Sequence, residues 1–306
     1  MGLNAAHFQQ TLVYEREADA GTLLEDLDQI SHLDDVAEQQ QRKWLIITLT
    51  VIGAAGLAAF SFAASDHVPG AVGAAAVGLI AAGFCGFQYR RYRRCNVEDR
   101  RYMLASQLLE LLRVDMDEDA QIDTYLDLRP VHDRSKLVNK GHVGAWKVKF
   151  FEDPWFQLSG RFLDGTGFEL TQTDLHQARS KTKRSRSGKL KHKSKTKSAF
   201  RAELRLRFKP AKYRHMAALK AEAEEAVQLP SGVELKRLRY NDREIGLRVA
   251  SKSEWSVRQG SKLLSRGVDG TRALSMMFLS LFQILNLSKA IQKASPTTDT
   301  GTGESA

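Results

Sequence analysis

Two long runs without a charged side chain interrupt an otherwise polar chain. They cover residues 44–64 and 68–87, and each approaches the roughly 20 apolar residues that cross the hydrocarbon core of a bilayer. A buried helical hairpin in a soluble protein is the alternative, although two charge-free runs of this length rarely occur together by chance. The pattern therefore predicts two transmembrane helices joined as a hairpin.

Basic residues flank both predicted spans, whereas the connecting loop near residues 65–67 contains no Lys or Arg. The positive-inside rule then places both chain termini in the cytoplasm, and aromatic residues at the ends of the spans are expected at the membrane–water interface. The compactness of the hairpin favours a bacterial inner membrane. The residues expected at this interface are Arg42, Lys43, Trp44, Tyr89, Arg90, Arg91, Arg93 and Arg94.

Small residues recur at every fourth position in both spans, and they allow two helix backbones to approach closely. They make either a contact between the two spans or a contact with a second copy of the chain, and the sequence does not separate these alternatives. The residues are Ala55, Ala59 and Ala63 in the first span and Ala74, Gly78, Ala82 and Gly86 in the second.

Helical patterns continue on the cytoplasmic side of both spans. Residues 19–43 carry an apolar stripe among acidic side chains, and residues 90–114 contain leucines but no Pro or Gly. Two helices that leave one hairpin on the same side begin close together. We therefore expect them to pair as an antiparallel helical stalk, preceded by a weakly patterned N-terminal segment, residues 1–18.

From residue 115 the spacing of apolar positions changes from a helical period to a period of two, which is typical of strands. Alternating runs surround an Asp-Gly pair, Asp164-Gly165, and flank Asn241-Asp242, and such pairs favour β-hairpins. We assign Asp153 and Asp164 to turns, and Pro154 to the start of a strand. The pattern predicts a cytoplasmic α+β domain with an antiparallel sheet over residues 115–294.

The last predicted helix, residues 272–292, is apolar nearly all round. It is expected to be buried in the domain core, in a subunit contact or shallowly in the bilayer. Polar side chains within it argue against a third span, and the tail over residues 295–306 has the composition of a disordered segment. The fold class is thus a membrane protein: a two-span α-helical hairpin with a helical stalk and a cytoplasmic α+β domain.

The net charge of +10 favours anionic partners, and much of the charge lies in one segment, residues 179–198. Between Lys189 and Lys197 every second residue is a lysine. The segment is either the tip of a long β-hairpin whose base is packed, or a disordered basic loop between two ordinary strands. Both alternatives present the same charge. The residues proposed to bind anions or lipid are Arg179, Lys181, Lys183, Arg184, Arg186, Lys189, Lys191, Lys193, Lys195 and Lys197.

Local motifs of catalysis are not found in the sequence, which has no GxxxxGK[ST], HExxH, paired CxxC or GxSxG. The sequence does not favour an enzyme, although an active site assembled from distant residues would leave no local pattern.

An acidic stretch that begins at Asp115 resembles the opening of a calcium loop. It has Ala120 where the sharp turn needs Gly, and Leu126 where a bidentate Glu belongs. We therefore expect no metal and no cofactor.

The sequence favours an integral membrane scaffold or assembly protein whose basic segment binds anionic phospholipid or an acidic protein. A membrane-anchored nucleic-acid-binding protein is the second hypothesis, although the segment lacks the aromatic side chains that usually stack on single-stranded bases. A membrane enzyme with an active site built from distant residues is the third. A homo-oligomer is compatible with all three.

Overall fold

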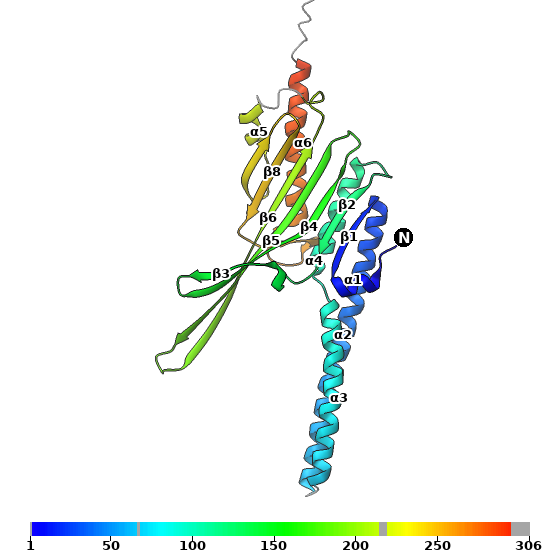
Figure 1. Ribbon diagram of the computed structural model, residues 1–306, viewed down its shortest axis with the longest axis vertical. Coiled ribbons are helices and arrows are strands. Elements are labelled where there is room, and N and C mark those ends of the chain that lie inside the picture. The colour runs from blue at the N-terminus through cyan, green and yellow to red at the C-terminus, as the bar shows by residue number, and fades with distance from the viewer. Residues whose placement is uncertain (1, 66–67, 214–218, 295–306) are drawn as a thin grey trace, which may run out of the picture. The chain divides into compact units, whose positions relative to one another are not determined.

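A computed structural model describes residues 2–65, 68–213 and 219–294, and the predicted tail over 295–306 lies outside these ranges. Figure 1 shows the course of the chain, which divides into two compact units. The first unit contains residues 1–12 and 25–99, and the second contains residues 13–24 and 100–306. The chain therefore enters the second unit twice.

The first unit is a pair of long antiparallel helices. It comprises α1 (Ala5–Thr11), most of α2 (Ala20–Ala64) and α3 (Val68–Cys95). The rings of Trp44 and Phe84 meet edge to face with centroids 6.1 Å apart. Farther along, a Cβ placed on Gly78 would lie 2.2 Å from the Cβ of Ala55. Of the small residues, Ala55 and Gly78 thus make a contact between α2 and α3, because only glycine fits at this crossing.

Three helices among the described residues are long and apolar enough to cross a membrane by length and composition: α2, α3 and α6 (Gly270–Ala294). This number differs from the two spans predicted. In the most apolar stretch of each helix, the share of residues buried within the protein is 0% for α2, 11% for α3 and 44% for α6. The apolar side chains of α2 and α3 are therefore mostly uncovered, whereas α6 is partly packed into the protein.

The continuous helix expected over residues 90–114 is interrupted. α3 ends at Cys95 and α4 (Asp99–Leu112) begins after three residues without helical structure, followed by the 3-10 turn η1 (Arg113–Asp115). At the break, the backbone N–H of Val97 donates to Asp34 Oδ1 at 2.9 Å. A side chain of α2 thus satisfies a backbone donor that lacks a helical partner, which no local pattern of residues 90–114 indicates.

The second unit is built on an eight-stranded antiparallel sheet in the order β1-β2-β4-β5-β6-β8-β7, with β3 paired to β4. Because β1 belongs to this sheet, residues 13–18 are part of the domain rather than of a separate N-terminal segment. The strands are β1 (Val13–Ala18), β2 (Ile122–Asp127), β3 (Leu137–Val143), β4 (Trp146–Arg161), β5 (Gly167–Arg184), β6 (Leu190–Arg207), β7 (Glu234–Tyr240) and β8 (Glu244–Ser251).

The predicted hairpin at Asp164-Gly165 is confirmed. Phe162 N–H donates to the Thr166 carbonyl at 2.9 Å, and Gly165 has a φ of +82° that favours glycine. The start of a strand at Pro154 is wrong, however, because β4 runs through this position. The β4–β5 register shifts between Asp153 and Phe156, so Pro154 lies in a β-bulge, where its missing N–H is tolerated.

The core lies between α6 and one face of the sheet. Phe278 of α6 meets Phe162 and Phe168 edge to face, with centroids 6.1 and 5.6 Å apart. α6 contacts β6 and β8, and its residues Met277, Leu281 and Ile284 are fully buried. The remaining short elements are η2 (Arg134–Lys136), α5 (Lys220–Ala226), β9 (Trp255–Ser256), β10 (Arg258–Gln259), β11 (Lys262–Leu263) and β12 (Val268–Asp269).

Candidate anion-binding surface

The basic segment forms a two-stranded ribbon at the end of the β5–β6 hairpin (Figure 1). The pairing continues without a bulge from Gly167 opposite Arg207 to Arg184 opposite Leu190. At the tip, Ser185 N–H donates to the Lys189 carbonyl at 2.8 Å, and Gly188 has a φ of +78°. Of the two alternatives left open by the sequence, the structure therefore contains the ordered hairpin. We call residues 177–197 the ribbon.

One face of the ribbon carries only basic side chains beyond Gln177. Directly paired residues of antiparallel strands point to the same face, and the register puts Lys181 opposite Lys193 and Lys183 opposite Lys191. In the described part of the chain, none of these side chains has a carboxylate partner at ion-pair distance. The members of this cationic face are Arg179, Lys181, Lys183, Lys191, Lys193, Lys195 and Lys197.

The opposite face of the ribbon carries mainly hydroxyl groups and histidine. Ser180 lies opposite Ser194, and Thr182 Oγ1 lies 3.0 Å from the Nδ1 atom of His192. Of the other predicted site residues, Arg184 lies on this hydroxyl face, opposite Leu190, while Arg186 and Lys189 belong to the turn. The ten predicted residues are therefore split, with seven on the cationic face and three at the tip.

Trp146 of β4 is a residue of the cationic face that the sequence did not indicate. The Lys181 Nζ atom lies 4.3 Å from the centroid of the Trp146 ring, which is the geometry of a cation–π contact. The β4–β5 register ends at Lys147 opposite Ser180, so Trp146 shares its face with Lys181 by alternation. The period-two pattern of β4 was visible in the sequence, but the strand register was not.

At the base of the ribbon, His176 continues the hydroxyl face. Its Nδ1 atom lies 3.1 Å from Ser198 Oγ, and its ring centroid lies 5.8 Å from that of His132. Burial and the neighbouring His132 lower the pKa of His176 below the usual 6.5. The lowered pKa disfavours the charged imidazole near pH 7, so His176 adds little positive charge at the base of the ribbon.

The predicted membrane-interface residues lie on α2 and α3. Arg42 donates to Glu38 Oε1 at 2.6 Å within one helical turn. Trp44 packs against Phe84 and is half-buried, as is Tyr89. At the end of α3, burial raises the pKa of the Cys95 thiol, although the positive charge of Arg91 acts to lower it. A reactive thiolate is therefore disfavoured at Cys95. The exposed basic residues are Arg42, Lys43, Arg90, Arg91, Arg93 and Arg94.

A second cluster of charged residues is sealed inside the sheet domain. Arg101 of α4 is 1% exposed and donates to Asp153 Oδ2 at 2.8 Å and to Asp174 Oδ2 at 3.3 Å. The Lys136 Nζ atom lies 2.9 Å from the same Asp153 oxygen. The assignment of Asp153 to a turn is therefore wrong, because the side chain is completely buried in an ion network. Such a network stabilises packing but offers a substrate no access.

The network extends to Asp127, whose Oδ2 atom lies 3.2 Å from Lys136 Nζ, and it keeps this carboxylate ionised. Burial alone would raise the pKa of Asp127, but hydrogen bonds from Arg129 and the charge of Lys136 lower it.

Asp164, unlike Asp153, stabilises a turn as predicted. Its Oδ1 atom accepts from Thr166 N–H at 2.8 Å, and its Oδ2 atom accepts from the Tyr213 hydroxyl at 3.0 Å.

In the described ranges, no group of three or more His, Cys, Asp or Glu side chains is placed to hold a metal ion. The cationic face of the ribbon is the candidate site that the strand register brings together. Comparison with known proteins adds no relative, since no protein-family model, no curated protein and no solved structure matches this chain.

Proposed function

We propose that the protein is a membrane-anchored scaffold whose ribbon docks on anionic phospholipid through its cationic face. The observation that carries this proposal is the segregation of charge, with seven basic side chains on one face and hydroxyl groups on the other. An unstructured basic loop would spread the same charges in all directions. A flat face presents them together to a flat, negatively charged surface.

Lysines directly opposite each other repel, which costs stability in an isolated sheet. Lys181 and Lys193, and Lys183 and Lys191, are such pairs. A surface of phosphate groups removes this repulsion, and each Lys or Arg near an anionic leaflet contributes about 1 kcal/mol. The arrangement is thus unfavourable alone and favourable at a lipid surface.

The anchor in this proposal is the α2–α3 hairpin, in an inner membrane with both termini in the cytoplasm. Many of its large apolar side chains are more than half exposed, among them Leu57, Phe60, Leu79 and Ile80. Exposed apolar surface of this extent requires a lipid or protein environment. Tethering to the bilayer raises the local concentration of the sheet domain near headgroups, so that a surface without a shaped pocket suffices for binding.

A pair of charge-matched variants tests the proposal. The full chain in phosphatidylcholine nanodiscs is mixed with vesicles that contain 30% phosphatidylglycerol, and co-flotation is measured. One variant replaces Lys191, Lys193 and Lys195 with Gln. The control replaces Lys140, Lys147 and Lys149, which are exposed on the hydroxyl-face side of β3 and β4. Losing three contributions of about 1 kcal/mol weakens binding up to roughly 100-fold.

We expect the first variant to lose vesicle binding and the control to keep most of it. Equal losses in the two variants would show that only total charge matters, and the role of the cationic face would be rejected. Duplex DNA and single-stranded RNA are added as competitors at two salt concentrations. Displacement of the vesicles by nucleic acid, with a steep dependence on salt, would favour the nucleic-acid-binding function instead.

A further inference from the structure

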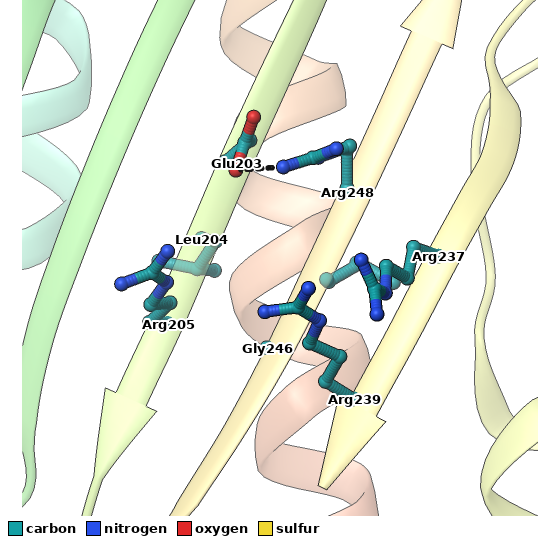
Figure 2. A pocket seen from close by; sticks show the side chains of 8 residues that line it. Glu203, Leu204, Arg205, Arg237, Arg239, Gly246 and Arg248 are labelled. Atoms are coloured by element: carbon teal, nitrogen blue, oxygen red, sulfur yellow. Dashed lines mark hydrogen bonds and ion pairs between the residues drawn. The ribbon is translucent and has the colours of Figure 1, made fainter.

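A second basic site lies on the outer face of the sheet, where β6, β8 and β7 run side by side (Figure 2). Its lining includes four arginines and one carboxylate around a glycine, and it forms a small hollow of about 30 Å³ that is open to solvent. This space is large enough for a group the size of a water molecule. The lining residues that matter are Glu203, Arg205, Arg237, Arg239, Gly246 and Arg248.

The strand register creates the hollow. Arg205 of β6 and Arg239 of β7 both pair with Gly246 of β8, one from each side. A Cβ on Gly246 would lie 3.5 Å from Arg205 Cγ and 3.6 Å from the Leu204 carbonyl oxygen, so a side chain at this position would fill the space. The hollow therefore exists because a residue without a side chain separates two arginines on one face.

The charges around Gly246 are not balanced. Arg248 is bonded to Glu203 at 2.9 Å. Arg205 lies 4.0 Å from Glu169, a carboxylate that lies closer to Arg207.

Arg237 and Arg239 make no ion pair or side-chain hydrogen bond within the part of the chain that the structure describes. Figure 2 shows both side chains extending from β7 toward β8. Two guanidinium groups thus face the hollow without an anion of their own.

We propose that this arginine hollow binds the dianionic phosphate of a phosphomonoester, either in a lipid headgroup or free in solution. The planar guanidinium fork matches phosphate oxygens in pairs, and two uncompensated arginines match two negative charges. The hollow takes one or two of the oxygens, while the remainder of the ligand stays in solvent. Unlike the ribbon, whose face attracts any anionic surface, this site selects one chemical group.

The test is isothermal titration of the full chain in zwitterionic detergent with glycerol 3-phosphate, alongside binding to vesicles that contain phosphatidic acid. The variant R237Q/R239Q is compared with R243Q/R266Q, which removes two exposed arginines outside the hollow. A charge-assisted hydrogen bond contributes about 1.5–3 kcal/mol. We therefore expect the first variant to bind at least about tenfold more weakly, and the control to bind like the unaltered chain.

A filling variant separates the hollow from its charge. Gly246→Val keeps all four arginines and suits a strand, and we expect it to weaken binding of glycerol 3-phosphate as strongly as R237Q/R239Q does. Replacing Lys191, Lys193 and Lys195 with Gln should leave this binding unchanged, so failure of the ribbon proposal would be seen separately.

Each outcome decides the proposal. Binding of the vesicles alone, lost in R237Q/R239Q, assigns the site to a lipid headgroup, and binding of glycerol 3-phosphate shows that the free group suffices. Binding of neither ligand, or equal binding by R237Q/R239Q and the control, overturns the proposal. In that case the arginines would only keep the edge strand β7 from pairing with other chains.

Discussion

Along the ribbon, the side chains of odd-numbered residues point to one face and those of even-numbered residues to the other. In β6 the lysines at 191, 193, 195 and 197 share one face, and the register with β5 adds Arg179, Lys181 and Lys183 to it. Shifting the register by one residue would place the lysines of β6 on the face opposite the basic residues of β5. The absence of a bulge along β5 and β6 is therefore as important for the cationic face as the lysines themselves.

Trp146 gives the cationic face a residue with a preference for the membrane interface. We expect its fluorescence to shift to shorter wavelengths when anionic vesicles are added, because its half-buried ring leaves water. Trp155 and Trp255 are 0% and 1% exposed, and Trp44 packs on Phe84, so these three should not respond. The shift should be absent in W146F. An equal shift in W146F would mean that the cationic face does not meet the lipid.

At the level of elements, the ion network joins α4 to three strands. Arg101 reaches the Asp127 carbonyl oxygen of β2 at 2.6 Å, and it pairs with Asp153 of β4 and Asp174 of β5. The Trp255 indole N–H donates to the second Asp174 oxygen at 2.7 Å. This network holds the bulge of β4 in place, because both carboxylates that flank the register shift are bonded to α4 or to β9.

Arg101→Met should therefore destabilise the sheet domain strongly. Removing one partner of a buried ion pair leaves an uncompensated charge, which costs about 3–5 kcal/mol. The measurement is urea unfolding of the full chain, followed by the fluorescence of the buried Trp155 and Trp255. Arg113→Met, at an exposed position just after α4, is the control and should change stability by less than about 0.5 kcal/mol. Similar losses in both variants would contradict a structural role for the network.

The elements that the sequence predicted are those set by local chemistry. The Asp164-Gly165 pair and the alternation around it are sufficient to specify that hairpin, and absence of charge is sufficient to indicate α2 and α3 as candidate spans. The features that the sequence did not predict depend on residues that are distant along the chain. Pro154 is accommodated because the β4–β5 pairing skips from Asp153 to Phe156, and on the other side β2 pairs with β4 only from Phe156 onward. The helix break at Val97 depends on Asp34. Likewise, Trp146 joins the cationic face only through the register with β5.

For the whole molecule, α6 is a third candidate span beside α2 and α3. Its length and composition allow a span, but one side of the helix is occupied by the sheet. Ser280 is 1% exposed, accepts from the Gln228 N–H at 3.0 Å and donates to the Gln228 carbonyl at 3.1 Å. Withdrawal of α6 into lipid would break these bonds and uncover Phe162 and Phe168.

We therefore expect two spans, with residues before and after α6 on the same side of the membrane. Reporter proteins that function only in the cytoplasm are fused to the N-terminus, after Asp269 and after Ala294 of the otherwise intact chain. If α2 and α3 alone cross, all three fusions are active, because a two-helix hairpin returns the chain to its original side. If α6 also crosses, the fusion after Ala294 is inactive while the other two remain active. That result would mean that α6 leaves the sheet in the membrane, and the sheet domain would then need a different core.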